Sequence, residues 1–244
     1  MLLNIRREEY KYYIGLNQVT FLEKALESLM NLDEACNNFH KSYSVKSLYF
    51  DTPDDKDLNE KLDGIIDREK FRIRTYPSSN SLPMYKLEQK LKFDTVIQKV
   101  SLKIEPEHVK NIQDGNYKDM KGLNNDFADY CYNRFSSLGY RPKVIVEYDR
   151  TAFTLPFCNI RITIDKNLST YNGGTDLMNA SLSKTPIFLD GMAILEVKFE
   201  KYLPSYIQNA LSKFNLKRCA ISKFVHSRVH TIGNSWSDHL VRPF

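Results

Sequence analysis

Apolar and polar residues alternate along several segments of the chain, and a period of two residues is typical of β-strands. In AILEVKFE, residues 193–200, one face carries only apolar side chains, and the opposite face carries Glu196 and Lys198. A half-buried strand whose charged face meets water would explain this pattern. The same segment could also line an enclosed site, where a carboxylate and an ammonium take part in chemistry.

The alternation predicts strands along most of the chain, within residues 5–14, 45–52, 64–76, 84–92, 95–104, 143–155 and 159–168, and near Ile187. Apolar residues at helical spacing predict helices within residues 17–32, 125–138 and 205–214. Residues 105–123 are expected to be irregular or to form a short helix, and residues 54–63 form a polar segment. No linker rich in Pro, Ser or Gly divides the chain, so we expect one domain over residues 1–244. Its predicted fold class is α+β, rich in antiparallel strands.

Cations recur on the polar faces of these strands, at Lys11, Arg72, Arg74, Lys86, Lys90, Lys99, Lys103, Arg150, Arg161 and Lys198. A solvated sheet face usually mixes charges of both signs, and like charges on neighbouring strands repel one another. A closed antiparallel barrel with a cationic lumen and helices against its outer wall satisfies the pattern. Because buried cations need an anionic partner, the lumen predicts a long, highly charged ligand such as a triphosphate or a polyphosphate.

Composition limits which ligands, metals and cellular locations are expected for this protein. Thirty-five Lys and Arg against thirty Asp and Glu give a formal charge of +5, which permits an anionic partner without requiring one. The aromatic residues lie largely on the apolar faces, so we expect no nucleic-acid binding through base stacking. Four separated cysteines and five scattered histidines indicate no zinc site. The amino-terminal residues lack the apolar run of a signal peptide, and no stretch approaches the roughly 20 apolar residues of a membrane span, so a cytoplasmic protein is expected.

Several segments between residues 7 and 224 carry a resemblance to a known family, namely REEYKYYI, SLYFDT, FRIRTY, KLEQK, EYDRTAF, IRITID, ILEVKF and ISKF. Together they resemble the VTC domain of the triphosphate tunnel, or CYTH-like, superfamily, the catalytic domain of vacuolar polyphosphate polymerases and of related bacterial proteins. The resemblance implies an eight-stranded antiparallel β-barrel tunnel with packing helices. It also implies a metal-dependent polymerase, which transfers the γ-phosphoryl group of ATP to a growing polyphosphate and releases ADP.

The resemblance implies roles for individual residues as well. The tunnel cations that act on phosphate would be Lys11, Arg72, Arg74, Lys90, Arg150 and Arg161. Further substrate contacts would come from Lys99, Tyr148, Lys198, Ser222 and the late-strand Lys223. Glu196 would coordinate Mg²⁺ or Mn²⁺, which prefer oxygen ligands. One position departs from the pattern, because Ala220 stands where eukaryotic polymerases tend to have a further lysine.

Structural alternatives remain for these residues. Glu196 and Lys198 could form only an ion pair, and Arg72 and Arg74 could be solvated. Tyr148 could be a packed aromatic, and Ser222 could mark a strand end. Glu88 could be a second metal ligand or could pair with Lys86 or Lys90, while Glu9 and Lys103 stay open between lumen and surface.

Three functions also remain open at this point. A polymerase, a triphosphatase in which water attacks, and a non-catalytic polyphosphate-binding module would all use a cationic tunnel. The expected ligands are ATP or another triphosphate, and polyphosphate or pyrophosphate. A membrane-protein partner, and association with a membrane complex, are expected only by analogy with the eukaryotic polymerases.

Overall fold

One antiparallel sheet organises the protein, for which a computed structural model describes residues 7–77, 83–93, 96–172, 174–188 and 191–233. Its main path runs through β1 (Arg7–Gly15), β10 (Met192–Glu200), β8 (Ile160–Asn172), β7 (Arg141–Leu155), β3 (Tyr43–Asp51), β4 (Arg68–Thr75), β5 (Tyr85–Phe93) and β6 (Val96–Ile104). Two short strands lie beside this path: β2 (Asn31–Leu32) pairs with β7, and β9 (Ser183–Pro186) pairs with β8. The strand pairs are antiparallel, which confirms the predicted β-rich α+β class.

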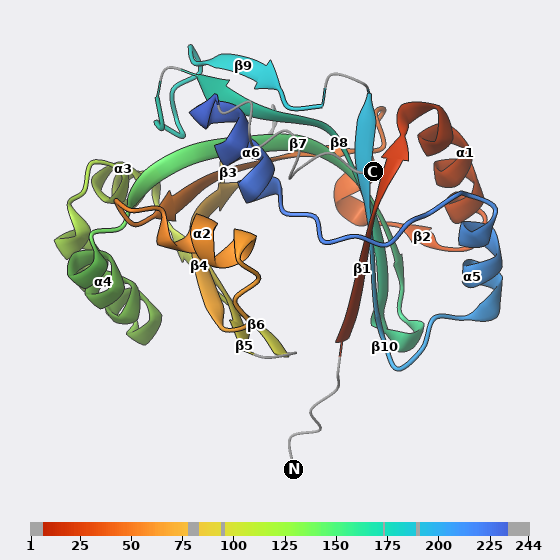
Figure 1. Cartoon of the computed structure of the whole chain (residues 1–244), viewed down its shortest axis with the longest axis horizontal. Helices are drawn as coiled ribbons and strands as arrows, with labels where there is room; N and C mark the ends of the chain where they lie inside the picture. Colours follow the sequence, from red (N-terminus) through yellow and green to blue (C-terminus); the bar gives the residue numbers. More distant parts are fainter. Residues whose placement is uncertain (1–6, 78–82, 94–95, 173, 189–190, 234–244) are drawn as a thin grey trace.

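The sheet curves into an arch and does not close into the predicted barrel (Figure 1). β1 and β6 are the two end strands, and they do not pair within the described residues. β1 uses its outer edge for a later segment instead, because Tyr12 bridges to Arg218 and the Cys219 amide donates to the Lys11 carbonyl at 3.0 Å. The expectation of a closed barrel was therefore wrong, although the main path has the expected eight strands.

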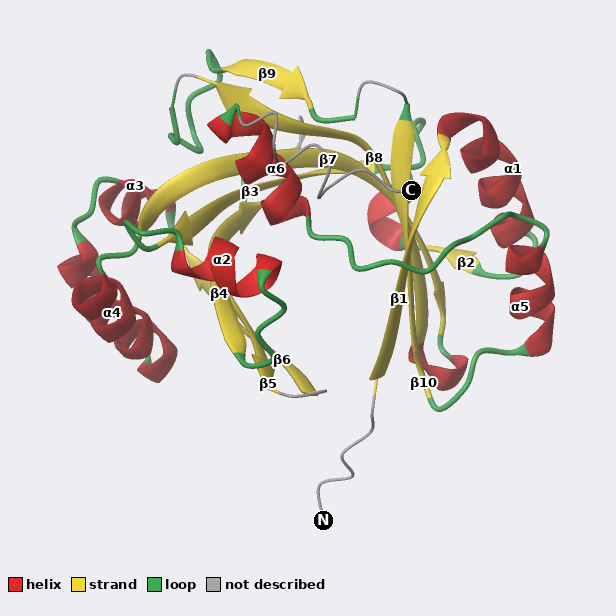
Figure 2. Cartoon of the chain, in the orientation of Figure 1, coloured by secondary structure: helices red, strands yellow, loops and turns green. Residues whose placement is uncertain are grey.

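Helices cover the convex face of the arch (Figures 1 and 2). α1 (Leu16–Glu27) and α5 (Ser205–Ser212) lie beside β1 and β10, with Leu22 and Leu195 in one hydrophobic cluster. At the other end, Phe71 and Phe135 share a second cluster, formed with α3 (Pro106–Gln113), the 3-10 helix η2 (Tyr117–Leu123) and α4 (Asp126–Leu138). The apolar strand faces thus point outward, and α1, α4 and α5 fall where helices were predicted. No helix in the described part of the chain has both the length and the apolar character needed to cross a membrane.

Two further helices, α2 (Lys56–Leu62) and α6 (Lys223–Ile232), lie on the concave side of the arch (Figure 1). Phe224 and Val225 of α6 belong to a third hydrophobic cluster, which includes Val146 and Tyr148 of β7. This packing fixes the start of α6 against the inner face of the sheet. It also corrects the placement of Lys223, which begins a helix and does not lie on a late strand.

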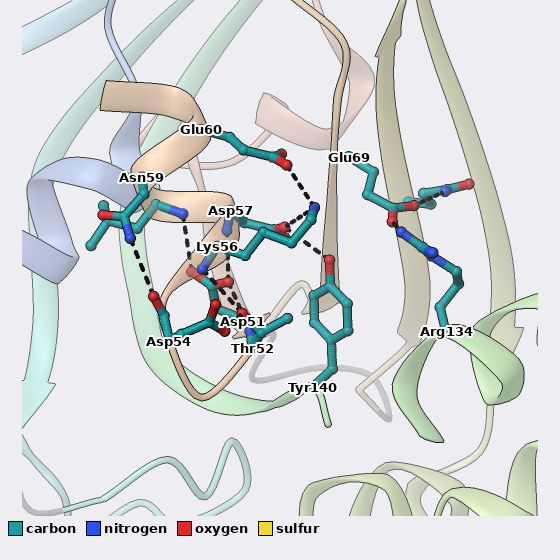
Figure 3. A network of polar contacts seen from close by, with 12 residues as sticks. Asp51, Thr52, Asp54, Lys56, Asp57, Asn59, Glu60, Glu69, Arg134 and Tyr140 are labelled. Carbon is teal, nitrogen blue, oxygen red and sulfur yellow. Dashed lines mark hydrogen bonds and ion pairs between the residues drawn. The ribbon is translucent and has the colours of Figure 1, made fainter. Parts of the chain in front are cut away.

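Buried side chains from outside α2 hold this short helix in place (Figure 3). One carboxylate oxygen of Asp51 accepts hydrogen bonds from the amides of Thr52 and Asp57 at 2.8 Å, and the other accepts from the Leu58 amide at 3.1 Å. The Tyr140 hydroxyl donates to Asp57 at 2.8 Å. Since the amides at a helix start lack partners within the helix, Asp51 supplies the acceptors that this polar segment needs to become helical.

Candidate functional site

A strongly cationic cavity of about 1110 Å³ lies on the concave face of the arch. Thirteen lysine and arginine side chains line it, against three glutamates. Its walls come from β1, β3, β4, β5, β6, β7, β10 and α2, and residues 218–224 also line it. Of the residues with a predicted role, the cavity brings together Lys11, Arg72, Arg74, Lys90, Lys99, Tyr148, Arg150, Glu196, Lys198, Ser222 and Lys223.

Glu88 organises the cations on β4 and β6. Its side chain is almost fully buried, and it lies 2.7 Å from Arg72 Nε, 3.6 Å from Arg74 Nε and 2.5 Å from Lys99 Nζ. Burial alone would raise the pKa of this carboxyl, but Arg72 and Arg74 lower it to about 2. Glu88 is therefore ionised at neutral pH, and it pairs with these cations and not with the Lys86 or Lys90 considered earlier. The Arg72 guanidinium also donates to the Tyr49 hydroxyl at 2.9 Å.

Asp165 of β8 plays the same part for two other cations that line the cavity, Arg150 and Lys223. This buried carboxylate accepts two hydrogen bonds from Arg150, at 2.6 and 2.8 Å, and lies 2.6 Å from Lys223 Nζ. Burial opposes its ionisation, but Lys223 and Arg150 lower its pKa. Arg150 in turn donates to the Tyr148 hydroxyl at 3.3 Å. Sequence reasoning missed Asp165, although its position two residues after Thr163 in IRITID places it on the cationic face.

Glu196 lies between two lysines at the β1–β10 pair. Lys198 forms a close ion pair with it, and Lys11 Nζ lies 3.5 Å from its second oxygen. The same Lys11 Nζ lies 2.7 Å from Glu9 of β1. Burial raises the pKa of Glu196, but Lys11 and Lys198 outweigh it and hold the pKa well below its ordinary value. Glu9 also lines the cavity, and its pKa is lowered too, chiefly by Lys11 acting against burial.

Residues 218–224, which we call the strap, run across β1 to the start of α6 (Figure 1). They also line the cavity. Lys11 Nζ donates to the Ile221 carbonyl of the strap at 3.4 Å, and the Arg218 guanidinium lies 3.9 Å from the centre of the Tyr10 ring. Ser222 caps α6, because its hydroxyl accepts from the Val225 amide at 3.4 Å, so it marks a helix start and not a strand end. Ala220 lines the cavity as well.

Three basic residues from the sequence analysis, Lys86, Lys103 and Arg161, do not line the cavity. Arg161 pairs with Asp33 at 3.0 Å and donates to the Tyr43 hydroxyl at 3.2 Å. Lys103 is exposed and lies 3.9 Å from Glu105. Sequence reasoning in turn passed over Lys61, Arg68, Lys70, Lys92 and Arg218, which do line the cavity. Arg68 and Lys70 alternate with Arg72 and Arg74, so the period of two residues carried this signal.

The carboxylates of Glu9 and Glu196 are the groups that could hold a divalent metal. No cluster of three or more His, Cys, Asp or Glu side chains with metal-binding geometry is present in the described residues. Mg²⁺ commonly uses only one or two carboxylates together with phosphate oxygens, so two ionised glutamates near a phosphate site fit this metal or Mn²⁺. Lys11 contacts both carboxylates and would have to yield part of that contact to the metal.

The comparisons with known proteins agree with this architecture. The VTC domain family matches residues 6–231. No curated protein matches the sequence. A solved structure of a candidate adenylate cyclase from Bacillus halodurans superposes with a TM-score of 0.52 at 11% identity, covering 94% of this chain and all of the other (100%).

Two other solved structures show a weaker overall likeness. The PH1819 protein from Pyrococcus horikoshii gives a TM-score of 0.46 at 13% identity and covers 92% of this chain and 99% of the other. A candidate adenylate cyclase from Vibrio parahaemolyticus gives 0.43 at 10% identity, covering 89% and 95%. The family match spans nearly the whole described chain, and of the motifs that carry the sequence resemblance all except IRITID contribute residues to the cavity. The chain therefore belongs to the VTC domain family.

Proposed function

We propose that the cavity binds ATP and polyphosphate and that the protein transfers the γ-phosphoryl group of ATP to the end of the polyphosphate chain. The observation that carries this proposal is the excess of cations, thirteen against three glutamates, around one cavity. The carboxylates of Glu88, Asp165 and Glu196 are ionised and neutralise the cations that they contact, which we call the central cations. The positive charge of the other lysines and arginines is available to an anion. Arginine forks and lysine ammoniums are the protein groups best suited to phosphate oxygens.

An incompletely satisfied donor supports the proposal that phosphate oxygens enter this cavity. Arg74 Nε is buried and has no hydrogen-bond partner in the described residues, although Glu88 lies 3.6 Å away. A buried charged donor without an acceptor is costly, so a ligand oxygen at this position would relieve that cost. Thr163 lies opposite Glu196 in the strand register, and its buried hydroxyl also has no hydrogen-bond partner in the described residues.

In the proposed reaction, an oxygen of the terminal phosphate of the chain attacks the γ-phosphorus of ATP. The bond from that phosphorus to the bridging oxygen breaks, and ADP leaves with the bonding electron pair. Such a transfer requires in-line positioning and neutralisation of charge on the phosphoryl oxygens. Arg72, Arg74 and Arg150, which Glu88 and Asp165 hold in place, would provide positioning and positive charge. A Mn²⁺ or Mg²⁺ ion held by Glu196, with Glu9 as a second carboxylate, would neutralise phosphate oxygens further.

One assay distinguishes the polymerase from its alternatives. Purified protein is incubated with ATP and Mn²⁺, and ADP, free phosphate and long polyphosphate are followed together. ADP with polymer supports the proposal. Nucleotide with orthophosphate or pyrophosphate but no polymer would indicate a triphosphatase. Binding of polyphosphate without turnover would indicate a binding module.

Substitution of Glu196 tests its proposed metal-binding role. Glu196→Gln keeps the size of the side chain but removes the charge, so turnover should fall by about a hundredfold or more while the protein stays folded. Glu147→Gln is a matched control, because Glu147 also pairs with a lysine, Lys184 at 2.7 Å, but does not line the cavity. Full metal-dependent activity in Glu196→Gln would show that Glu196 does not have this role.

A further inference from the structure

Four cations that line the cavity come from α2, the start of β4 and the end of β5, and they form a group distinct from the cations that contact carboxylates. We call Lys61, Arg68, Lys70 and Lys92 the mouth cluster; all four line the cavity. In the register of β4 and β5, Arg68 lies directly opposite Lys92, and Lys70 lies directly opposite Lys90. Like charges at directly opposed positions destabilise a sheet. The neighbouring pair, Arg72 with Glu88, has the ordinary arrangement of opposite charges.

The mouth cluster differs from the central cations in its lack of counter-charges. Each of Lys11, Arg72, Arg150, Lys198 and Lys223 has a carboxylate within ion-pair distance. Among the described residues, no carboxylate comes within 4.0 Å of the charged groups of the mouth cluster. Within the described ranges, Lys90 has one carboxylate at ion-pair distance, Glu9 at 3.7 Å.

Two carboxylates of α2 that act electrostatically on the mouth cluster, Asp57 and Glu60, have closer partners elsewhere (Figure 3). Glu60 pairs with Lys56 at 2.8 Å, and Asp57 accepts from Tyr140 at 2.8 Å. Burial and the nearby Asp51 raise the pKa of Asp57 to about 7, so its negative charge is only partly present at neutral pH. Asp57 and Glu60 therefore act on Lys70 and Arg68 only from beyond ion-pair distance.

Lys70 shows the imbalance most clearly. Its ammonium nitrogen is buried, has no hydrogen-bond partner in the described residues and lies 4.3 Å from the centre of the Phe224 ring. Burial, together with Lys61 and Arg68, lowers its pKa to about 7 against the attraction of Asp57. A negatively charged group beside the mouth cluster would restore the charge of Lys70 and relieve the repulsion among all four cations.

The position of the mouth cluster indicates which anion it fits. Arg68 lies four residues before Arg72 on β4, roughly 13 Å along the strand at about 3.3 Å per residue. A nucleotide whose triphosphate is held at Arg72 and Arg74 would not extend over that distance with its phosphates alone. We propose that the mouth cluster is a separate phosphate subsite, which binds units of a linear polyphosphate beyond the nucleotide triphosphate. This inference rests on the proposed function in taking polyphosphate as a ligand of the cavity.

The test compares the affinities of the protein for tripolyphosphate and for a polyphosphate of several tens of units, by calorimetry at fixed salt. The variant Arg68→Gln with Lys92→Gln removes one opposed pair, and each residue is only partly buried. Affinity for the long chain should fall by about tenfold or more, since charge-assisted hydrogen bonds are the strong ones, while affinity for tripolyphosphate should change by less than about twofold. The control variant, Lys24→Gln with Lys110→Gln, loses the same charge at exposed positions outside the cavity and should bind both ligands as the unmodified protein does.

Three results would overturn the subsite: equal losses for both ligands, equal losses in the control variant, or no binding of long polyphosphate by the unmodified protein. Lys70→Met provides a second variant, with the same expected selectivity for the long chain. Because binding is measured without turnover, the two proposals fail separately. A protein that makes no polymer but shows the chain-length selectivity retains the subsite, and one that makes polymer without the selectivity retains only the activity.

Discussion

Asp165 should stabilise the empty cavity far more than the occupied one. Its carboxylate is buried and holds Arg150 through two hydrogen bonds and Lys223 through an ion pair, all within 2.8 Å. Breaking a buried pair by removing one partner costs about 3–5 kcal/mol, because the other charge stays buried without compensation. Asp165→Asn keeps one acceptor oxygen, so we take the lower end, about 3 kcal/mol. At 2–4 °C per kcal/mol for a domain of this size, the melting temperature should fall by about 6–12 °C.

Added tripolyphosphate should reduce this difference. In Asp165→Asn, the phosphate oxygens can take over the donors of Arg150 and Lys223, so the ligand should raise the melting temperature more in the variant than in the unmodified protein. Differential scanning fluorimetry with and without ligand measures both values. Asp149→Asn is the control, since Asp149 of β7 does not line the cavity and accepts a hydrogen bond from Asn167. A variant that melts within about 2 °C of the unmodified protein, with and without ligand, would refute the reasoning.

Two further predictions concern the pH dependence of stability and the uptake of a proton on ligand binding. Burial, followed by Lys223, lowers the pKa of His226 to about 4, whereas an unfolded histidine titrates near 6.5. The unfolded state thus binds a proton first as the pH falls from 6.5 to 4, and the protein should lose up to about 3 kcal/mol of stability over that window. Urea unfolding at pH 7 and pH 5 measures the loss, which should be smaller in His226→Gln; equal losses would contradict the assignment. Lys70, facing Asp57, Lys61 and Arg68, has a pKa of about 7, so it is largely neutral at pH 8, and polyphosphate binding should draw a proton onto it. Calorimetry at pH 8 in buffers of different ionisation enthalpy measures this uptake, which should shrink in Lys70→Met; an unchanged uptake would exclude Lys70 as its source.

The period of two residues was enough to predict most of the cavity wall. Arg72, Arg74 and Glu88 face inward because strand alternation leaves no other choice once Ile73 and Leu87 enter the core. The pattern could not decide which charged side chains on that face would stay in the cavity. Arg161 lies on the same face, but Asp33, from the turn after β2, binds it elsewhere.

The remaining differences depend on contacts between distant residues. The segment of α2 is too polar for its helix to be predicted from periodicity. What makes it helical lies outside it: Asp51 accepts hydrogen bonds from its first amides, and Tyr140, 83 residues away, donates to its buried Asp57. The role of Asp165 depends on Lys223, and no local pattern joins these two residues. Closure of the barrel was predicted from charge placement, but backbone pairing decided otherwise when Arg218 and Cys219 took the edge of β1.

The contact between β1 and the strap can form only late in the synthesis of the chain. Lys11 reaches Ile221 across 210 residues, so the first strand and the strap are joined only after nearly the whole domain has left the ribosome. Until then, a nascent chain exposes the basic interior of the arch without the part of the cavity lining that residues 218–224 supply. Contacts between residues so distant in sequence also form slowly. A cellular polyanion that enters the arch at this stage would neutralise its lysine and arginine side chains. Under the proposed function, the anion that the finished cavity binds would thus also favour folding of that cavity.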